Sequence, residues 1–539
     1  MFPRKELRIR VMSRLYRVVM ALLLLAEVSS FGEETSNPGI VARITREGLE
    51  YAHRHGVATL KNERSNIKLP DFSGLFSFSW LGEVSYDFHS LKIHHFVVQH
   101  SELELLPQRG VGAFLFNDYV SLSGMWKVKK AFMSLAGSFD LSVDGIIMSV
   151  SLNLGKDHFG RPTASVGHCS SSIGRVSIDI SGNLSWMLNL FQERIEKNLK
   201  NMLEQKICNV VRKAVTSRLQ PYLQTLPVTW MIDEVAGIDY RLVGAPLVSS
   251  QSLDMLFKGE FFNRRQRSPI PFEAPAIMLP QKHDRMIYFA VSEYVFNTAS
   301  WVYCQNKRMN FIIRNEHLMN LTKLSNHQSA KKWRKQHSNP SCLSQANAPL
   351  TTTLSCFSNS FLLLLLQFPL NSPMSLHTSS FRVLIPKLAR LYPNMEMELE
   401  VSPESAPFLI LTPGNVTIMA VVDIQAFALL PKSSDRMPLF QLRGRTNISI
   451  TIDVSSSRIF GSMTTGSTLK LELKQSNVGV FNVQLMETIF NYYAQHTIYP
   501  SLNAKLEEGF PLPLPRDIYL NSLVLQIHKN FLLFGANID

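Results

Sequence analysis

Three lysines and a tryptophan lie close together in the segment Gly124–Phe132, which reads Gly-Met-Trp-Lys-Val-Lys-Lys-Ala-Phe. Ammonium groups at this spacing repel one another, and an anionic partner such as a phosphate would offset the repulsion. The tryptophan adds an amphipathic ring of the kind that lies at a lipid headgroup boundary. The candidate residues for binding a phosphorylated lipid are Trp126, Lys127, Lys129 and Lys130. The alternative is a solvated turn with a partly buried tryptophan, because charged turns are common.

Predicted strands position this segment. Apolar residues alternate with serines through Tyr119–Ser123, and a second strand is predicted from Met133 to Val143. Pairing of the two as a hairpin would place the lysines at its tip. Asp144-Gly145 then predicts another hairpin turn. We expect the loop 157–160, flanked by the candidate residues Lys156 and Arg161, to lie at the same end as the tip.

Two long amphipathic helices are predicted, one in each half of the chain. The apolar residues of Leu184–Leu219 share one face, Gly182-Asn183 precede them, and Pro221 is expected to end the helix. Val483–Tyr499 is the second helix, ended by Pro500. A weaker helical pattern runs from Ile40 to Ala52.

A basic and then proline-rich segment at residues 263–280 predicts an extended linker. On either side, residues 37–262 and 281–537 each combine long alternating strands with one long helix. The sequence therefore predicts a duplicated α+β fold.

Composition favours a protein that binds something apolar. The chain has 539 residues, of which 45% are hydrophobic and only 18% are charged, whereas about 25% charged residues is usual. Nine of the 13 formal positive charges come from residues 1–30 and 318–367. The rest of the chain is weakly basic, which excludes a diffuse basic surface for nucleic acid and makes electrostatic recognition local.

Residues 1–30 have the features of a secretory signal peptide, with a basic start and the short apolar run Val18–Ala26. That run is shorter than the roughly 20 residues that span a bilayer, so we expect a secreted protein. Five cysteines without CxxC spacing leave at least one thiol unpaired and support neither a metal site nor a redox motif. The histidines at 89, 94, 95 and 100 suggest a metal cluster, but His94 and His95 would point to opposite faces of a strand. No metal site is expected, and the absence of enzyme motifs predicts a protein without enzymatic activity.

Several segments resemble the lipopolysaccharide-binding protein and bactericidal/permeability-increasing protein family. They are Asn37–Ile44, Leu69–Phe72, Leu219–Val228, Tyr294–Ser300, Gly509–Pro513 and Phe531–Asn537. The resemblance covers residues 37–537 except about 318–367. Gly124–Lys130 and Leu388–Met395 are most similar to the lipopolysaccharide-binding branch of the family.

The resemblance implies a boomerang of two elongated antiparallel barrels, each with long amphipathic helices, joined by a central sheet and the linker. It implies a disulfide between Cys169 and Cys208 and an apolar pocket in each barrel that holds the acyl chains of a phospholipid. It also implies that the tip residues meet the phosphates of lipid A. Lys129 stands where the family motif carries an arginine, which keeps the charge and loses the bidentate fork.

The function implied is lipopolysaccharide binding and lipid transfer in innate immunity. The expected partners are lipopolysaccharide, phospholipids, the bacterial outer membrane surface and a host lipopolysaccharide co-receptor, without nucleic acid. Two alternatives stay open: a bactericidal protein that damages Gram-negative outer membranes, and a plain phospholipid or neutral-lipid carrier. The lysine cluster argues against the plain carrier.

Two further features concern processing. N-x-S/T sequons begin at Asn183, Asn320, Asn415 and Asn447; Asn415 and Asn447 are predicted glycosylation sites, and Asn183 is equally placed to cap a helix. Residues 318–367 contain no Asp or Glu and end in Phe-Leu-Leu-Leu-Leu-Leu-Gln. This composition is what a translated polypyrimidine tract and splice acceptor would give, so we interpret the segment as a retained intron. A disordered insertion is the alternative.

Overall fold

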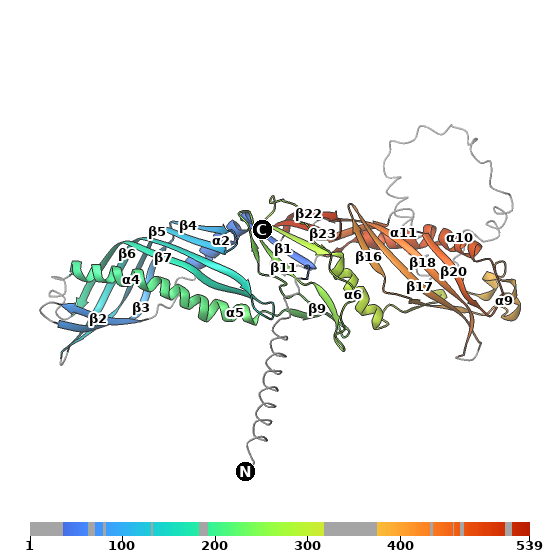
Figure 1. The fold of residues 1–539 in the computed structure, drawn as a ribbon, viewed down its shortest axis with the longest axis horizontal. Helices are drawn as coiled ribbons and strands as arrows, with labels where there is room; N and C mark the ends of the chain where they lie inside the picture. The colour runs from blue at the N-terminus through green and yellow to red at the C-terminus, as the bar shows by residue number, and fades with distance from the viewer. Residues whose placement is uncertain are drawn as a thin grey trace, which may run out of the picture.

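Curled antiparallel sheets lie at the two ends of an elongated molecule, a central sheet joins them, and long helices run along the curled sheets (Figure 1). This computed structural model describes residues 36–62, 71–78, 82–130, 133–182, 192–316, 375–431, 435–455, 458–463, 468–511 and 520–538. The α+β class and the arrangement of two curled sheets about a central one agree with the predicted fold. The predicted signal peptide, Asn183, Asn320 and the segment 318–367 lie outside the described residues.

The central sheet is antiparallel and nearly symmetric about its middle. Its order is β10-β11-β1-β13-β23-β22, so three strands come from the chain before the linker and three from the chain after it. The innermost pair joins Ala42 of β1 to Phe289 of β13. The strands are β1 (Ile40–Thr45), β10 (Leu247–Val248), β11 (Ser252–Phe257), β13 (Ile287–Ser292), β22 (Leu520–His528) and β23 (Phe531–Ile538). Ile40 and Ile44 therefore belong to a strand, and the helical pattern predicted from Ile40 is wrong for its first part.

The linker packs against one face of this sheet. Residues 264–286 contain neither helix nor strand, and Ile277 and Leu279 pack on a core that includes Val41 and Tyr288. Arg43 of β1 donates to both carboxylate oxygens of Asp254, at 2.8 and 2.7 Å, and to the Pro280 carbonyl. The first strand of the fold therefore holds the linker in place.

The N-terminal curled sheet has the order β2-β3-β5-β6-β7, with β4 paired to β5. Its strands are β2 (Phe72–Phe78), β3 (Gly82–Val97), β4 (His100–Leu106), β5 (Gly110–Lys130), β6 (Met133–Lys156) and β7 (Pro162–Gly182). Its helices are α2 (Arg46–Asn62) and the series α4 (Gln192–Ala214), η2 (Val215–Leu219) and α5 (Gln220–Thr225). Ile195 and Leu199 of α4 enter the core formed by the inner face of the sheet.

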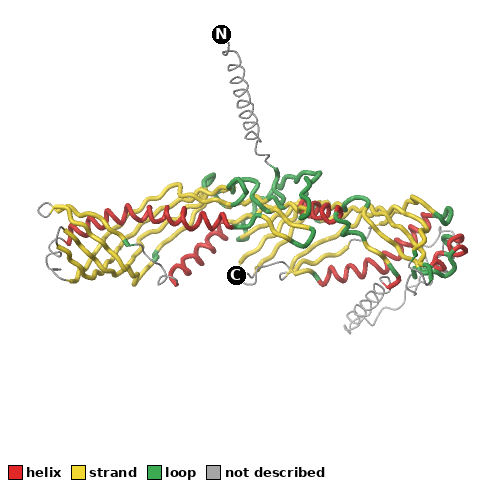
Figure 2. The backbone as a smooth tube through the Cα atoms, turned by 90° about the horizontal axis from the view of Figure 1, so that it is seen from below, coloured by secondary structure: helices red, strands yellow, loops and turns green. Residues whose placement is uncertain are grey.

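The C-terminal curled sheet repeats this plan. Its strands are β14 (Phe311–Ile313), β15 (Met397–Pro403), β16 (Phe408–Thr412), β17 (Asn415–Leu429), β18 (Arg436–Ser455), β19 (Arg458–Met463), β20 (Thr468–Ser476) and β21 (Phe510–Pro511). The helices are α6 (Glu293–Gln305), the 3-10 helix η3 (Thr378–Phe381), α9 (Pro386–Leu391), α10 (Val483–Tyr493), η4 (Ala494–Ile498) and α11 (Tyr499–Glu508). Viewed from below, the long helices lie along both curled sheets (Figure 2).

A π-turn lies in each long helix, two residues before a proline. Pro221 and Pro500 have no N–H to donate, and a proline ring clashes with the carbonyl four residues back in an α-helix. That carbonyl belongs to a π-turn in both cases, η2 before Pro221 and η4 before Pro500. The wider turn accommodates the proline and the helix continues beyond it. The predictions that Pro221 and Pro500 end their helices are therefore wrong.

The long helices cover strand edges through polar side chains as well as apolar ones. Glu204 of α4 accepts a hydrogen bond from the Ile173 N–H of β7 at 2.8 Å. Glu487 of α10 accepts from the Leu471 N–H of β20, also at 2.8 Å. Within the described residues, β7 and β20 are edge strands, because each pairs with one other strand only. The helices thus satisfy strand edges that would otherwise be open to pairing.

Candidate functional site

The lysine segment is part of a strand in the structure. β5 continues to Lys130, which pairs with Met133 at the start of β6, and residues 131 and 132 lie outside the described part of the chain. Lys127 lies directly across from Asp87 of β3, and Lys129 lies across from Ser85. The two lysines share the outer face because strand side chains alternate. Nothing is described for the side chain of Lys130.

Lys127 and Lys129 are not engaged by other charges. Lys129 is exposed and Lys127 is half-buried. Within the described residues neither lysine makes an ion pair, although Asp87 is opposite Lys127; Asp87 instead lies 3.7 Å from His89. These two ammonium groups are therefore available to an external anion at the end of the N-terminal sheet.

Trp126 does not have the predicted role at a headgroup boundary. It is only 3% exposed and packs in the inner core with Tyr86 and Phe139. Its indole N–H donates to two backbone carbonyls, those of Ser138 at 3.2 Å and Ser181 at 3.1 Å. Because Ser138 lies in β6 and Ser181 in β7, Trp126 holds three neighbouring strands together below the lysines.

A third cation on the same outer face escaped the sequence reasoning. Lys92 of β3 is exposed and lies across from Ser123 of β5, on the face of Lys127. The register between β3 and β5 shifts next to Lys92, so simple alternation gave no sign of its position. Its neighbour His94 contacts the Ser123 hydroxyl at 2.6 Å.

Lys156 and Arg161 lie far from the lysine segment, which contradicts the prediction that they share its end. β6 runs unbroken from Met133 to Lys156, a span of about 75 Å at 3.3 Å per residue. The loop after it contacts the middle of the molecule: the Leu242 N–H donates to the Gly160 carbonyl at 2.8 Å, and Arg161 Nε donates to the Leu226 carbonyl.

The cause of this error is the pair Asp144-Gly145. It forms no hairpin turn: Gly145 has a φ of +66° and lies within β6 against Gly174 of β7. The chain therefore does not reverse there, and residues 146–156 continue away from the lysines.

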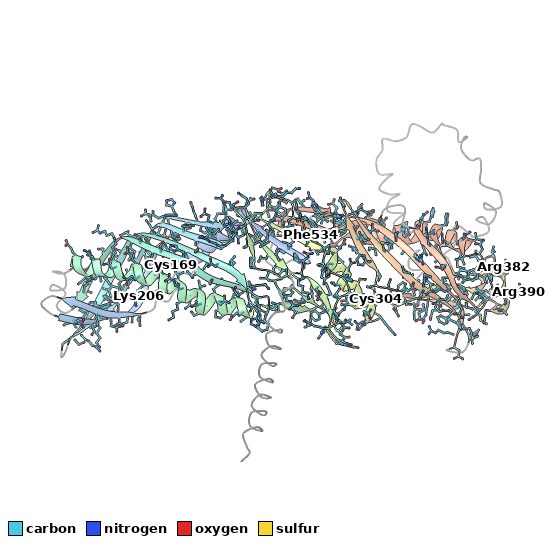
Figure 3. All side chains as sticks on the ribbon, in the orientation of Figure 1. Cys169, Lys206, Cys304, Arg382, Arg390 and Phe534 are labelled. Carbon is cyan, nitrogen blue, oxygen red and sulfur yellow. A yellow bond between two sulfur atoms is a disulfide. The ribbon has the colours of Figure 1, made fainter. Side chains whose placement is uncertain are left out.

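A disulfide joins Cys169 of β7 to Cys208 of α4, as predicted, and attaches the long helix to the edge of the sheet. Cys169 is labelled on the N-terminal half in Figure 3, and Cys304 is labelled on α6. Cys304 is a free thiol whose pKa is raised by burial. Cys342 and Cys356 lie outside the described residues.

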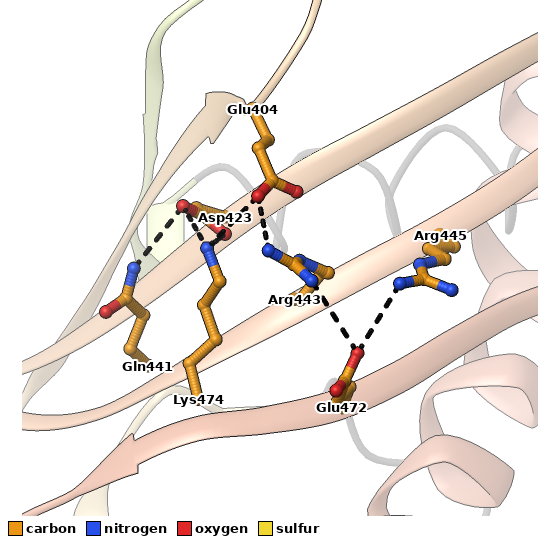
Figure 4. Close-up of polar contacts among 7 residues, drawn as sticks. All are labelled: Glu404, Asp423, Gln441, Arg443, Arg445, Glu472 and Lys474. Atoms are coloured by element: carbon orange, nitrogen blue, oxygen red, sulfur yellow. Dashed lines mark hydrogen bonds and ion pairs between the residues drawn. The ribbon is translucent and has the colours of Figure 1, made fainter.

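The outer face of the C-terminal sheet carries a contrasting set of charges (Figure 4). Lys474 Nζ lies 2.7 Å from Asp423 and 3.5 Å from Glu404. Arg443 pairs with Glu404, and Arg445 lies 3.6 Å from Glu472. Each of these cations thus has a carboxylate partner.

A second group of charges on this sheet surrounds a buried carboxylate. Glu398 of β15 is 1% exposed and accepts from Arg314 at 2.7 Å and from Arg436 at 2.8 Å. Burial alone would raise the pKa of Glu398, but the hydrogen bonds from the two guanidinium groups outweigh it and hold the pKa below its ordinary value.

The predicted acyl-chain pockets remain predictions. A cleft of about 210 Å³ lies against the central sheet, lined by charged side chains such as Lys282 and Arg285 and by apolar ones such as Val524 and Leu533. This volume is too small for the acyl chains of a phospholipid. The described helices include none long and apolar enough to cross a membrane. Among the described side chains, no three His, Cys, Asp or Glu residues gather as a metal site would require.

The predicted glycosylation sites differ in setting. Asn447 is exposed on β18. Asn415 begins β17 and donates from Nδ2 to the Thr417 hydroxyl of its own sequon at 3.1 Å.

Comparison with known proteins identifies the class to which this duplicated fold belongs. The family model described as LBP / BPI / CETP family, N-terminal domain, matches residues 48–222. The C-terminal domain model of the same family matches residues 230–328 and 348–539. The chain belongs to the LBP / BPI / CETP family.

Relatives within this family extend over almost the whole chain. The lipopolysaccharide-binding protein of Homo sapiens is 43% identical over 522 residues, and the match covers 97% of each chain. The bactericidal permeability-increasing protein of Rattus norvegicus is 32% identical, and covers 96% of this chain and 97% of its own. A crystal structure of lipopolysaccharide binding protein has 40% sequence identity and a TM-score of 0.49, and covers 93% of this chain and 99% of that one.

Proposed function

We propose that this protein binds lipopolysaccharide at the outer end of its N-terminal sheet and transfers it to a host receptor. The observation that carries the proposal is the pair Lys127 and Lys129, two cations on one face that make no ion pair with any described residue. The 43% identity to a protein named for lipopolysaccharide binding supports it.

The lysines would neutralise lipid A phosphates at the surface of an aggregate, with the adjacent residue Lys130 and, on the same face of the sheet, Lys92 as further cations. Trp126 would act indirectly, by keeping β5, β6 and β7 in register beneath the lysines. Acyl chains would enter an apolar pocket in each barrel, where a bound phospholipid serves as the resident ligand at other times. Burial of each methylene contributes about 0.8 kcal/mol, which makes removal of a molecule from its aggregate feasible.

The test is binding of labelled lipopolysaccharide to a variant with Lys127→Glu and Lys129→Glu. A unit charge 4 Å from another contributes about 1 kcal/mol in water, so reversing two charges weakens binding by about 100-fold or more. The matched control is Lys470→Glu with Lys529→Glu, which changes the net charge equally at exposed positions of the second half. Equal affinity of the two variants would refute the assignment.

Transfer and killing separate this function from that of a bactericidal protein, the second candidate. Catalytic amounts of the secreted protein, mixed with lipopolysaccharide aggregates and a receptor ectodomain, should load the receptor. Bacterial killing without such transfer would favour the bactericidal role. Extraction and mass spectrometry of the purified protein would identify the phospholipid proposed for the barrels.

We also propose that residues 318–367 are absent from the mature protein. The family model leaves residues 329–347 unmatched and matches the rest of the segment, so it supports a shorter interruption of the family's sequence than the one proposed. A tryptic peptide that joins Asn315-Glu316-His317 directly to the Phe368 region would establish the proposal. Abundant peptides from within the segment would overturn it, and the same mapping would report glycans at Asn415 and Asn447.

A further inference from the structure

The edge of a small sheet in the middle of the molecule exposes three consecutive large apolar side chains. The sheet has the order β12-β9-β8, with β8 (Thr229–Met231), β9 (Ala236–Asp239) and β12 (Glu260–Asn263). Trp230, Met231 and Ile232 are 61%, 49% and 49% exposed. Contiguous exposed apolar residues usually mark a surface that contacts something else.

Hydrogen bonds fix the turn that follows these residues. Asp233 accepts from the N–H groups of Val235 and Ala236, both at 2.8 Å, and from the Tyr303 hydroxyl at 2.7 Å. The Ile232 N–H donates to the Ala236 carbonyl at 3.0 Å. The apolar side chains are therefore presented by a rigid edge, and the Asp233 carboxylate is occupied by internal donors.

Cations surround this edge. Arg264 donates from its guanidinium to the Asp233 carbonyl, and Arg308 lies 3.5 Å from Glu234. Arg267 stacks over the Phe262 ring at 3.8 Å. Phe262 and Met231 both pair with Gly237, from opposite sides of β9, so Arg267 covers a ring about 10 Å from Met231, two strand spacings away.

The local charge is positive. The residues around this edge include two exposed carboxylates, Asp233 and Glu234. They include five exposed cations, which are Arg264, Arg265, Arg267, Lys307 and Arg308. The other charged groups of the sheet pair with one another, Asp239 with Arg241 and Glu260 with Lys258.

We propose that this surface, formed by β8, Ile232 and the five cations around them, docks on an anionic phospholipid bilayer. Tryptophan lies at the boundary of the headgroups, arginine and lysine are attracted to the negative surface, and methionine and isoleucine enter the apolar layer beneath. The occupant is not an extended peptide, because a strand of three residues offers too short an edge for β-augmentation. This contact is separate from the lysines of β5 and does not depend on their role.

The test uses the full chain and vesicles of phosphatidylcholine with 30% phosphatidylglycerol, compared by flotation with vesicles of phosphatidylcholine alone. Trp230→Gln with Met231→Gln should reduce binding to the anionic vesicles by about tenfold, and Arg265→Gln with Lys307→Gln should do so mainly at low salt. Met278→Gln with Val480→Gln removes two exposed apolar side chains elsewhere and should leave binding unchanged.

Trp230→Phe provides a readout that does not depend on reduced binding. This variant should bind the anionic vesicles as the wild type does, while brominated phospholipids quench its remaining tryptophan fluorescence less. Equal quenching in the two proteins would overturn the proposal. The proposal would also be overturned if the Trp230→Gln, Met231→Gln protein bound anionic vesicles as tightly as the wild type does. This outcome counts against the proposal even if sedimentation shows that the substitutions disrupt contacts between copies of the chain.

The lysines of β5 are tested separately in the same assays. One outcome is that Lys127→Glu with Lys129→Glu lowers the affinity for lipopolysaccharide while the wild type does not bind anionic vesicles. The docking surface is then refuted and the proposed function stands. If vesicle binding depends on Trp230 while the lysine variant binds lipopolysaccharide normally, the proposed site fails and the docking surface stands.

Discussion

The outer faces of the two curled sheets use their cations differently. On the C-terminal sheet, Lys474 is held by Asp423 of β17, and Arg443 is held by Glu404, which directly follows β15. On the N-terminal sheet, Lys127 and Lys129 lack ion pairs within the described residues, even with Asp87 across the strand from Lys127. Lys474 and Arg443 are thus held within the fold, whereas Lys127 and Lys129 stay available to a ligand. The same strand geometry serves both uses, and only the placement of acids decides between them.

The helices show a second difference. Both long helices satisfy strand N–H groups with side chains, Glu204 in one half and Glu487 in the other. A disulfide adds a covalent attachment in the N-terminal half. The half with unneutralised surface charge therefore has the stronger helix attachment.

Removal of the disulfide should have the largest effect on stability. Cys169→Ser with Cys208→Ser should cost about 2–5 kcal/mol, because the bond constrains the unfolded chain. The loss of stability should appear in the N-terminal half, and limited proteolysis or hydrogen exchange of α4 measures it. Cys304→Ser is the control, since that thiol is free, and should cost less than about 1 kcal/mol. Equal losses in both variants would contradict the comparison.

Glu398→Gln should have the next largest effect and should act on the C-terminal half. The substitution weakens two charge-assisted hydrogen bonds at a buried site, at a cost of about 1–3 kcal/mol at pH 7. Because the pKa of Glu398 is lowered in the folded state, its contribution is present above the unfolded pKa and is lost as pH falls through the folded pKa.

Denaturation of the Glu398 variant as a function of pH measures both effects. The wild type should lose stability in acid more steeply than Glu398→Gln, and the two should converge at low pH. Glu400→Gln, at a more exposed neighbour of Arg436, should leave the pH dependence near that of the wild type. Parallel pH profiles for Glu398→Gln and the wild type would exclude the assigned role.

Lys474→Gln should have a smaller effect, about 0.5–1 kcal/mol, because its pair with Asp423 is partly exposed. A double-mutant cycle with Asp423→Asn isolates the interaction, which should shrink at 1 M salt as screening increases. A coupling energy of zero would mean that the network of Figure 4 contributes no stability.

The smallest effect is expected for Lys127→Gln with Lys129→Gln. Lys129 is exposed, Lys127 is half-buried, and neither makes an ion pair with a described residue. Substitutions at such surface positions usually change stability by less than about 0.5 kcal/mol, and relief of repulsion between the lysines opposes any loss. Chemical denaturation checks this beside the binding assay. A loss above 1 kcal/mol would show that these lysines stabilise the fold, and the contrast between the two faces would fail.

Alternation and motif resemblance predicted the class of fold, the duplication, the disulfide and the segment that carries the lysines. They failed where local turn or breaker signals were overridden by longer-range structure. Asp144-Gly145 has the sequence of a hairpin turn, but its glycine lies against Gly174 in a continuous ladder. A proline normally ends a helix, but a π-turn before Pro221 and another before Pro500 accommodate the two rings.

The candidate site was predictable in position and not in detail. The clustering of lysines indicated the end of the sheet, whereas the indole of buried Trp126 is satisfied by the carbonyls of Ser138 and Ser181, 12 and 55 residues further along the chain. Lys92 reaches the same face through a register shift that the residue pattern does not reveal. Whether Lys127 pairs with Asp87 depends on the position of His89, which lies near Asp87 in the folded structure.

The symmetry of the central sheet has a consequence for quaternary structure. The linker divides the sequence, but in space the division runs between β1 and β13, the middle pair of the sheet. A fragment that ends in the linker would keep β10, β11 and β1 and expose the edge of β1 that β13 covers. Because the two halves pair antiparallel about a near-dyad, two such fragments could complete one sheet by joining β1 to β1. The isolated half would then be a homodimer shaped like the intact monomer.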